Sequence, residues 1–270
     1  MQRCYIKPEN WRTDGDLELE ASEQHHLLHV LRFATGTPVM AFDGAGREAE
    51  TRLRYDTETQ TAYLEVIQMQ TAADTAHKIE WILVPAIIKG SRMDSLIEKA
   101  TELGATRIIP IQTARSVVRL DARQAVAKVE RWKRIAISAA KQCGTTQLPA
   151  IDPVTDLADA LRTLQASQTP ILQGSLQGTP APIARIAREQ IANQVSAIAI
   201  LTGPEGDFTD QEYAQSAEAG CIPVSLGNLT LRAETATIYT LSVLQALSQE
   251  KAEKLICHKE SCNLRRATLP

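Results

Sequence analysis

Strand and helix patterns alternate through residues 79–247, and this alternation strongly limits the folds open to the chain. Continuous apolar runs predict buried strands, and apolar residues at helical spacing predict the helices between them. Such alternation is typical of an α/β domain with a largely parallel sheet, because parallel neighbours need a long crossover connection. We expect further helices in the gaps, strands at 79–84, 107–111, 169–172, 197–201 and 222–225, and helices at 93–103, 124–142 and 234–247.

The residues before this region have a different pattern. Runs at 38–42 and 48–55 flank a turn-rich segment at 43–46, which predicts a hairpin, and 61–66 supplies another strand. A short helix is expected at 22–31. Small polar residues at 71–77 suit a linker. We therefore expect three parts: a mostly β unit at 1–72, the α/β domain at 73–250 and a polar tail at 251–270.

Composition excludes several classes of protein. Hydrophobic residues make up 44% of the 270 and charged residues 23%, which is near the globular average. We expect no membrane span, because no apolar run approaches the roughly 18 residues that a span requires. The first ten residues lack the apolar stretch of a secretory signal, so a cytoplasmic protein is expected.

The cysteines predict neither a disulfide framework nor a metal site. Five of them lie at irregular spacing along the chain. Cys257, His258 and Cys262 lack a matching fourth ligand, so we favour a mobile tail over a zinc site and expect no metal. For Cys143 we favour a buried position at a helix end over a reactive thiol.

Charge is distributed unevenly along the chain. The formal net charge is −3, but residues 73–150 hold 13 Lys and Arg against 7 Asp and Glu. Residues 1–72 and 151–250 are acidic, with net charges of −5 and −7. A basic segment between acidic ones indicates a surface that faces a polyanion, and solvated helix faces are the alternative.

One glycine motif is a false match. Gly44 to Ala49 fits the dinucleotide-binding pattern G-x-G-x-x-A in its letters. That pattern requires a helix to begin at once, so that its N-terminus meets the pyrophosphate. A strand follows here instead, and we interpret the glycines as a hairpin turn.

Two later loops indicate a ligand site. Gly203-Pro204-Glu205-Gly206 follows a buried strand, and the next helix has a predicted capping box, Thr209 with Glu212. Phe208 and Tyr213 occupy the positions of a hydrophobic staple around that box. The loop at 225–235 also follows a strand. Ligands of open α/β sheets bind at the carboxyl ends of strands, and the alternative for the first loop is an ordinary connection. In the second loop Arg232 and Glu234 would lie at the mouth of the same pocket, and the alternative is a helix-start charge at Glu234 with Arg232 as its surface partner.

A third loop, 89–94, carries two cations next to a predicted helix N-terminus. Lys89 and Arg92 with nearby backbone amides would suit a phosphate group. Solvated charges are the alternative interpretation.

Several motifs together resemble the ribosomal RNA small subunit methyltransferase E family, a part of the SPOUT methyltransferase superfamily. The resemblance spans about residues 1–250, and its motifs occur in the family's order. They are Arg3-Cys4-Tyr5-Ile6, His29-Val30-Leu31-Arg32, Asp43-Gly44, Lys89-Gly90-Ser91-Arg92-Met93, Glu98 to Gly104, Arg115-Ser116-Val117-Val118, Arg131-Trp132, Ala140 to Gly144, Gly203 to Gly206, and Leu231-Arg232-Ala233-Glu234-Thr235.

The resemblance implies a fold and an activity. A PUA-like β-barrel would precede a SPOUT-type α/β domain with a C-terminal trefoil knot, and the chain would form a homodimer. The enzyme would transfer a methyl group from S-adenosylmethionine to N3 of a specific uridine in 16S rRNA of the small ribosomal subunit. The cofactor-binding residues implied are Leu172, Gln173, Gly174, Leu201, Thr202, Gly203, Pro204, Glu205, Gly206, Ser225, Leu226, Gly227 and Leu231.

The chemistry of N-methylation adds candidate catalytic residues. Uracil N3 must lose its proton before it attacks, so the site must stabilise the resulting anion and exclude water. We assign the stabilising charge to Arg232, and the orienting or proton-accepting role to Glu205 or Glu234. Phosphate contacts come mainly from Lys and Arg, and the candidates for RNA binding are Arg3, Arg32, Lys89 and Arg92.

Two residues depart from the family pattern. Asp207 stands where a glycine is usual, and Leu229 stands where a basic residue is usual. They support an alternative, an RNA-binding or ribosome-assembly module that has lost catalysis. A SPOUT methyltransferase with another RNA target is a nearer alternative.

Overall fold

The computed structural model describes the backbone of residues 1–12, 15–71 and 79–266, with side chains over 1–12, 15–70 and 79–251. Contacts divide the chain into two compact units, which we describe separately. The first comprises Met1–Ala76 with Glu130–Ala150, and the second comprises His77–Val129 with Ile151–Pro270.

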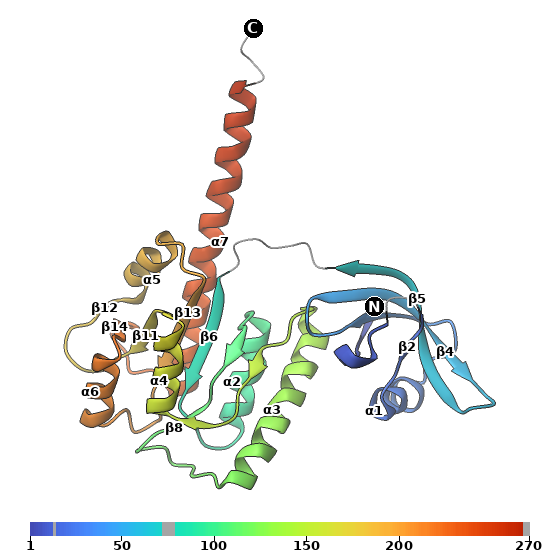
Figure 1. The fold of residues 1–270 in the computed structure, drawn as a ribbon, viewed down its shortest axis with the longest axis horizontal. Coiled ribbons are helices and arrows are strands. Elements are labelled where there is room, and N and C mark those ends of the chain that lie inside the picture. Colours follow the sequence, from blue (N-terminus) through green and yellow to red (C-terminus); the bar gives the residue numbers. More distant parts are fainter. Residues whose placement is uncertain (13–14, 72–78, 267–270) are drawn as a thin grey trace. The chain divides into compact units, whose positions relative to one another are not determined.

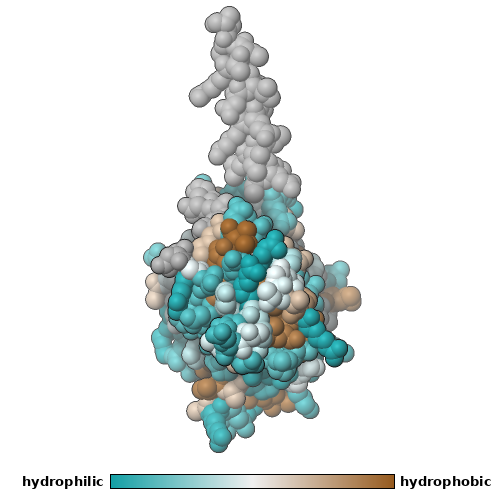
Figure 2. Space-filling model, turned by 90° about the vertical axis from the view of Figure 1, so that its right-hand side faces the viewer, coloured by the Kyte–Doolittle hydropathy of each residue, from teal (hydrophilic) through white to brown (hydrophobic). Residues whose placement is uncertain are grey.

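The first unit is built on a five-stranded sheet in the order β1-β3-β4-β5-β2. Its strands are β1 (Gln2–Tyr5), β2 (Leu17–Glu18), β3 (Pro38–Phe42), β4 (Arg47–Asp56) and β5 (Thr61–Thr71), joined by η1 (Pro8–Asn10), α1 (Ala21–His25) and the π-helical turn η2 (His26–Val30). Apolar residues that alternate along the strands, such as Val39, Ala41 and Leu53, pack into one core. The face of the molecule that Figure 2 shows is mainly hydrophilic, and its hydrophobic residues lie in separate patches.

The hairpin predicted at 38–55 is confirmed, and so is its turn. The Asp43 carboxylate accepts hydrogen bonds from the backbone N–H groups of Ala45 and Arg47, at 2.8 and 2.9 Å. Gly44 and Gly46 have positive φ angles of 77° and 103°, which glycine adopts without strain. No helix follows these glycines, so the dinucleotide motif is a false match as predicted.

The second unit contains a seven-stranded sheet in the order β12-β14-β11-β13-β6-β7-β9 (Figure 1). Each neighbouring pair of strands from β12 to β7 runs parallel, as the alternation predicts. The strands are β6 (Glu80–Pro85), β7 (Arg107–Ile108), β9 (Ala150–Ile151), β11 (Ile171–Gly174), β12 (Ala181–Pro182), β13 (Ala197–Thr202) and β14 (Ile222–Ser225), and a separate pair joins β8 (Ile111–Gln112) to β10 (Thr155–Asp156).

Helices cover both faces of this sheet. Leu157, Leu161 and Leu164 of α4 (Leu157–Ala166) pack with Ile82 and Val84 of β6, and α4 also contacts α6 (Asp210–Glu218). The helix α7 (Ala233–Arg266) contacts α2 (Ser91–Glu102), α5 (Ile183–Ala192), β6 and β13. The long helix α3 (Ala122–Cys143) is shared between the two units. The α/β class predicted from the sequence is therefore confirmed.

Three expectations need correction. The strand predicted at 107–111 is split, because Pro110 has no N–H group to continue the ladder. The last helix does not end near 247 but runs to Arg266, because residues 248–266 contain no Gly or Pro and are rich in strong helix formers. Cys143 is exposed rather than buried, since it is the last residue of α3.

Candidate functional site

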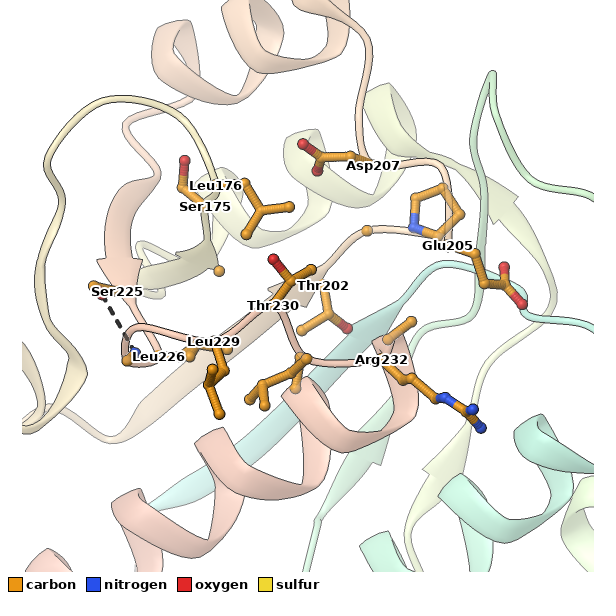
Figure 3. A pocket seen from close by; sticks show the side chains of 17 residues that line it. Ser175, Leu176, Thr202, Glu205, Asp207, Ser225, Leu226, Leu229, Thr230 and Arg232 are labelled. Atoms are coloured by element: carbon orange, nitrogen blue, oxygen red, sulfur yellow. Dashed lines mark hydrogen bonds between the residues drawn. The ribbon is translucent and has the colours of Figure 1, made fainter.

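A cavity of about 290 Å³ lies at the carboxyl ends of three neighbouring parallel strands, β11, β13 and β14 (Figure 3). Ligands of open α/β sheets bind at such ends, where loops can approach a ligand from several strands. The cavity is lined by Gly174, Ser175, Leu176, Thr202, Gly203, Pro204, Glu205, Asp207, Ser225, Leu226, Gly227, Leu229, Thr230, Leu231, Arg232, Ala233 and Ala236.

The loop after β13 is fixed by the start of α6. The Thr209 hydroxyl accepts from the Glu212 N–H at 3.2 Å, and the Glu212 carboxylate accepts from the Thr209 N–H at 2.8 Å. This is the predicted capping box. The rings of Phe208 and Tyr213 meet edge to face at 5.7 Å, as the staple prediction requires. The buried Glu212 also accepts from the N–H of Ala114 at 2.7 Å, which ties the loop to its neighbour.

Glycines keep the backbone accessible along the cavity. A Cβ atom on Gly203 would come within 3.1 Å of the Phe208 ring and 3.4 Å of the Asp207 carboxylate. Gly227 has a φ of +118°, which other residues rarely adopt. Glycine therefore avoids a tight contact with Phe208 at position 203 and a strained backbone at position 227.

Most residues predicted to bind the cofactor line this cavity. They are Gly174, Thr202, Gly203, Pro204, Glu205, Ser225, Leu226, Gly227 and Leu231. Four others do not line it: Leu172, Gln173 and Leu201 are buried within their strands, and Gly206 faces Arg115.

Sequence reasoning missed part of the lining, namely Ser175, Leu176, Asp207, Leu229, Thr230, Ala233 and Ala236. Asp207 and Leu229 were visible only as departures from a family pattern. Thr230 and Ala233 lie in the predicted ligand loop at 225–235 without having been assigned to the cofactor, and no motif distinguishes Ser175, Leu176 and Ala236.

The three candidate catalytic residues have different positions. Glu205 and Arg232 line the cavity and extend toward the same side of it in Figure 3, whereas Glu234 does not line it. The Arg92 guanidinium lies 2.9 Å from the Glu205 carboxylate and 4.0 Å from that of Glu234. The Lys89 N–H also donates to Glu205, at 3.4 Å. The segment expected to hold a phosphate thus faces a carboxylate of the protein itself.

Asp207 has a distinctive conformation on the wall of the cavity. Its φ of +59° falls in the left-handed region, which explains why a glycine is favoured there. Its two carboxylate oxygens accept from the Tyr213 hydroxyl at 2.9 and 3.0 Å. Burial, and secondarily the Asp207 carboxylate, raises the pKa of Tyr213 above its usual value, so the phenol stays protonated.

The four candidate RNA-binding residues differ in their availability. Arg32 and Lys89 are exposed. Arg3 lies 3.3 Å from Glu48 and stacks over the Phe42 ring, and Arg92 pairs as described above. Their roles toward RNA stay predictions.

Two absences apply to the part of the chain that the structure describes. No cluster of potential metal ligands occurs there, and Cys257, His258 and Cys262 lie outside the described side chains. No helix within those residues has the length and apolarity to cross a membrane. The linker predicted at 71–77 falls almost wholly outside the described residues.

Comparison with known proteins gives consistent matches. Residues 75–245 match the model of an RNA methyltransferase domain. Ribosomal RNA small subunit methyltransferase E of Bacillus subtilis is 30% identical over 90% of this chain and 96% of its own length, and that of Synechocystis is 29% identical over 91% and 77%. The crystal structure of the Neisseria gonorrhoeae enzyme of the same name, bound to S-adenosyl methionine, superposes with a TM-score of 0.79 at 33% identity, covering 92% of this chain and 98% of the other.

Proposed function

The chain belongs to the ribosomal RNA small subunit methyltransferase E family and is an S-adenosylmethionine-dependent rRNA methyltransferase, and from this premise we propose that it methylates N3 of one specific uridine in 16S rRNA. The observation that carries the proposal is the cavity at the ends of β11, β13 and β14, where glycine-rich loops meet Glu205 and Arg232.

The residues of the cavity fit S-adenosylmethionine. Leu176, Leu226, Leu229 and Leu231 offer an apolar surface for the adenine ring. Gly174, Gly203 and Gly227 leave backbone groups open to hydrogen-bond the edges of the purine and the ribose. When bound, the cofactor supplies an electrophilic methyl group on a sulfonium sulfur.

The chain's own residues prepare the uracil. Arg232 at the rim of the cavity stabilises the negative charge that develops on a uracil oxygen as N3 loses its proton. Glu205 accepts that proton, since it is the candidate carboxylate that lines the cavity, and Arg92 and the Lys89 N–H hold it in place. Glu234, whose carboxylate lies 4.0 Å from the Arg92 guanidinium, helps to orient Arg92.

We further propose the domain plan that the resemblance implies. Residues 1–72 form a PUA-like β-barrel that binds RNA, residues 73–250 form the SPOUT domain with its knot, and two chains make a homodimer. Sedimentation at equilibrium measures the mass, and a monomer at micromolar concentration contradicts the dimer.

The test of the function is methyl transfer to a defined nucleotide. Purified protein with isotope-labelled S-adenosylmethionine and unmodified small subunits should yield labelled 3-methyluridine at one site, identified by nucleoside mass spectrometry. Label on another base or another RNA would favour the alternative target. If the protein bound the cofactor but transferred no methyl group to any RNA, that result would favour the non-catalytic module. Neither departure requires that module, because Asp207 is accommodated with a hydrogen bond and Leu229 lies on the lining.

A further inference from the structure

Asp207 contributes a carboxylate to the cavity for which the proposed mechanism has no use. The residue belongs to the loop after β13 and lines the cavity. In Figure 3 its side chain points across the cavity wall toward Ser175 and Leu176. One carboxylate oxygen lies 3.4 Å from the point where a Cβ of Gly203 would stand, so the charge lies directly over the glycine of the loop.

The position of this carboxylate is set by rigid groups. Its partner, the Tyr213 hydroxyl, contacts both oxygens. The Tyr213 ring in turn packs edge to face on Phe208, which is buried. An aspartate held at both oxygens by one packed phenol has little freedom to turn away into solvent.

The charge of Asp207 is not neutralised in the way that the charge of Glu205 is. Glu205 pairs with Arg92, whereas the donor to Asp207 is a neutral phenol. Across the residues that the structure describes, no lysine, arginine or histidine forms a salt bridge with Asp207. A partly buried carboxylate without a cation is costly, and a cationic ligand in the cavity would offset that cost.

We propose that Asp207 is a specificity-determining residue that recognises the positive charge of the sulfonium, so that the cavity prefers S-adenosylmethionine to the demethylated product. This inference rests on the proposed function. Methyl transfer converts the sulfonium into a neutral thioether, while the amino-acid ammonium and carboxylate are unchanged. A carboxylate near the sulfur therefore favours the reactant over the product, and the product leaves more readily.

The same attraction predicts that the KM for the cofactor and the rate of methyl transfer respond differently to the loss of Asp207. The positive charge disappears as the methyl group leaves, so Asp207 stabilises the bound reactant more than the transition state. Removal of the charge should raise the KM for the cofactor and leave the single-turnover rate equal or faster.

Isothermal titration calorimetry with the full chain tests the proposal. Asp207→Asn keeps the shape and tolerates a positive φ. It should weaken binding of S-adenosylmethionine about five- to tenfold, the size expected for one partly screened ion pair, and change binding of S-adenosylhomocysteine less than about twofold. An analogue that carries a protonated amine in place of the methylated sulfur should follow S-adenosylmethionine.

Two further variants separate charge from structure. Asp210→Asn removes the same charge three residues away, from an exposed position that does not line the cavity, and should leave the preference unchanged. Asp207→Gly restores the family residue and should lose the preference as Asp207→Asn does, with the melting temperature as a check on folding.

Equal weakening of all three ligands by Asp207→Asn would overturn the proposal, because it would assign Asp207 to the ammonium or to loop structure. Unchanged affinities would overturn it as well. A protein that binds the cofactor with this preference but methylates another base would contradict the proposed target and leave the inference standing. A wild-type chain that binds none of the ligands would contradict both.

Discussion

At the scale of single residues, Arg92 shows how a correct chemical expectation can be met by another partner. The sequence places two cations beside a helix start, which predicts an anion there. The structure does place an anion there, but it is the Glu205 carboxylate, with that of Glu234 farther away. The residue types are visible in the sequence, whereas the contact joins positions more than one hundred residues apart. Spacing along the chain therefore could not reveal it.

Arg232 is the residue on which the proposed chemistry depends most. Arg232→Ala should lower the turnover number about 100-fold, the usual cost of one lost group that stabilises developing charge. The dissociation constant for S-adenosylmethionine should change less than about threefold, because charge develops on the uracil rather than on the cofactor. Single-turnover methylation and calorimetry measure the two effects. Arg185→Ala, on the exposed surface of α5, is the control, and equal losses in both variants would contradict the assignment.

The buried thiol of Cys221 should make the folded protein less stable at alkaline pH. Burial raises the pKa of its thiol from 9.0 to about 12 in the folded state. Folding therefore favours the protonated thiol, and this contribution is complete below pH 9 and is lost as the pH rises toward 12.

The free energy of unfolding should accordingly fall between pH 9 and pH 12, by up to about 1.4 kcal/mol per unit from this residue. Urea unfolding of the wild type and Cys221→Ala at pH 8 and pH 10 measures the effect. The variant should show a shallower fall. Cys143→Ala, at an exposed cysteine, should keep the wild-type slope, and identical slopes in all three proteins would show that Cys221 is not the cause.

At the scale of elements, local sequence patterns predicted whether a segment is a helix or a strand better than they predicted where it begins and ends. The hairpin at β3 and β4, the fully buried β13 and the capping box of α6 follow from periodicity and turn chemistry, and the structure confirms each. Two-residue strands such as β9 and β12 leave no periodic pattern, because they exist only through their neighbours in the sheet. The loops that form the cavity could likewise be predicted from the sequence. That Leu176 and Asp207 line it could not.

The capping box of α6 predicts an effect on stability that is larger than usual for a helix start. Glu212 accepts from the Thr209 N–H, the Thr209 hydroxyl and the Ala114 N–H, so its loss takes the carboxylate partner from two part-buried backbone donors and one hydroxyl at once. Glu212→Ala should cost about 2–3 kcal/mol. Chemical denaturation measures the cost, with the exposed Glu218→Ala as the control. If Glu212→Ala were as stable as Glu218→Ala, the hydrogen bonds to Glu212 would stabilise the fold no more than hydrogen bonds to water do.

At the scale of the whole molecule, net charge is a poor guide to partners. The value of −3 averages a basic segment at 73–150 with acidic segments on both sides. Several of the cations are engaged in ion pairs, as Arg107 is with Asp152 and Lys99 with Glu98 and Glu102. We therefore expect RNA binding to depend on exposed cations, and the candidates Lys89, in the basic segment, and Arg32, outside it, are both exposed.

This limited set of cations predicts a measurable dependence on salt. The logarithm of the RNA association constant should fall linearly with the logarithm of salt concentration, with a slope of about −0.7 to −0.9 for each phosphate contacted. Lys89→Ala and Arg32→Ala should each make the slope shallower by about one such step. Arg162→Ala, on an exposed face of α4 where Arg162 pairs with Asp159, is the control and should keep the wild-type slope. A flat salt profile of the wild type would contradict binding through phosphates. If Lys89→Ala and Arg32→Ala kept the slope, the contacts would lie with other cations, and these two residues would not be RNA ligands.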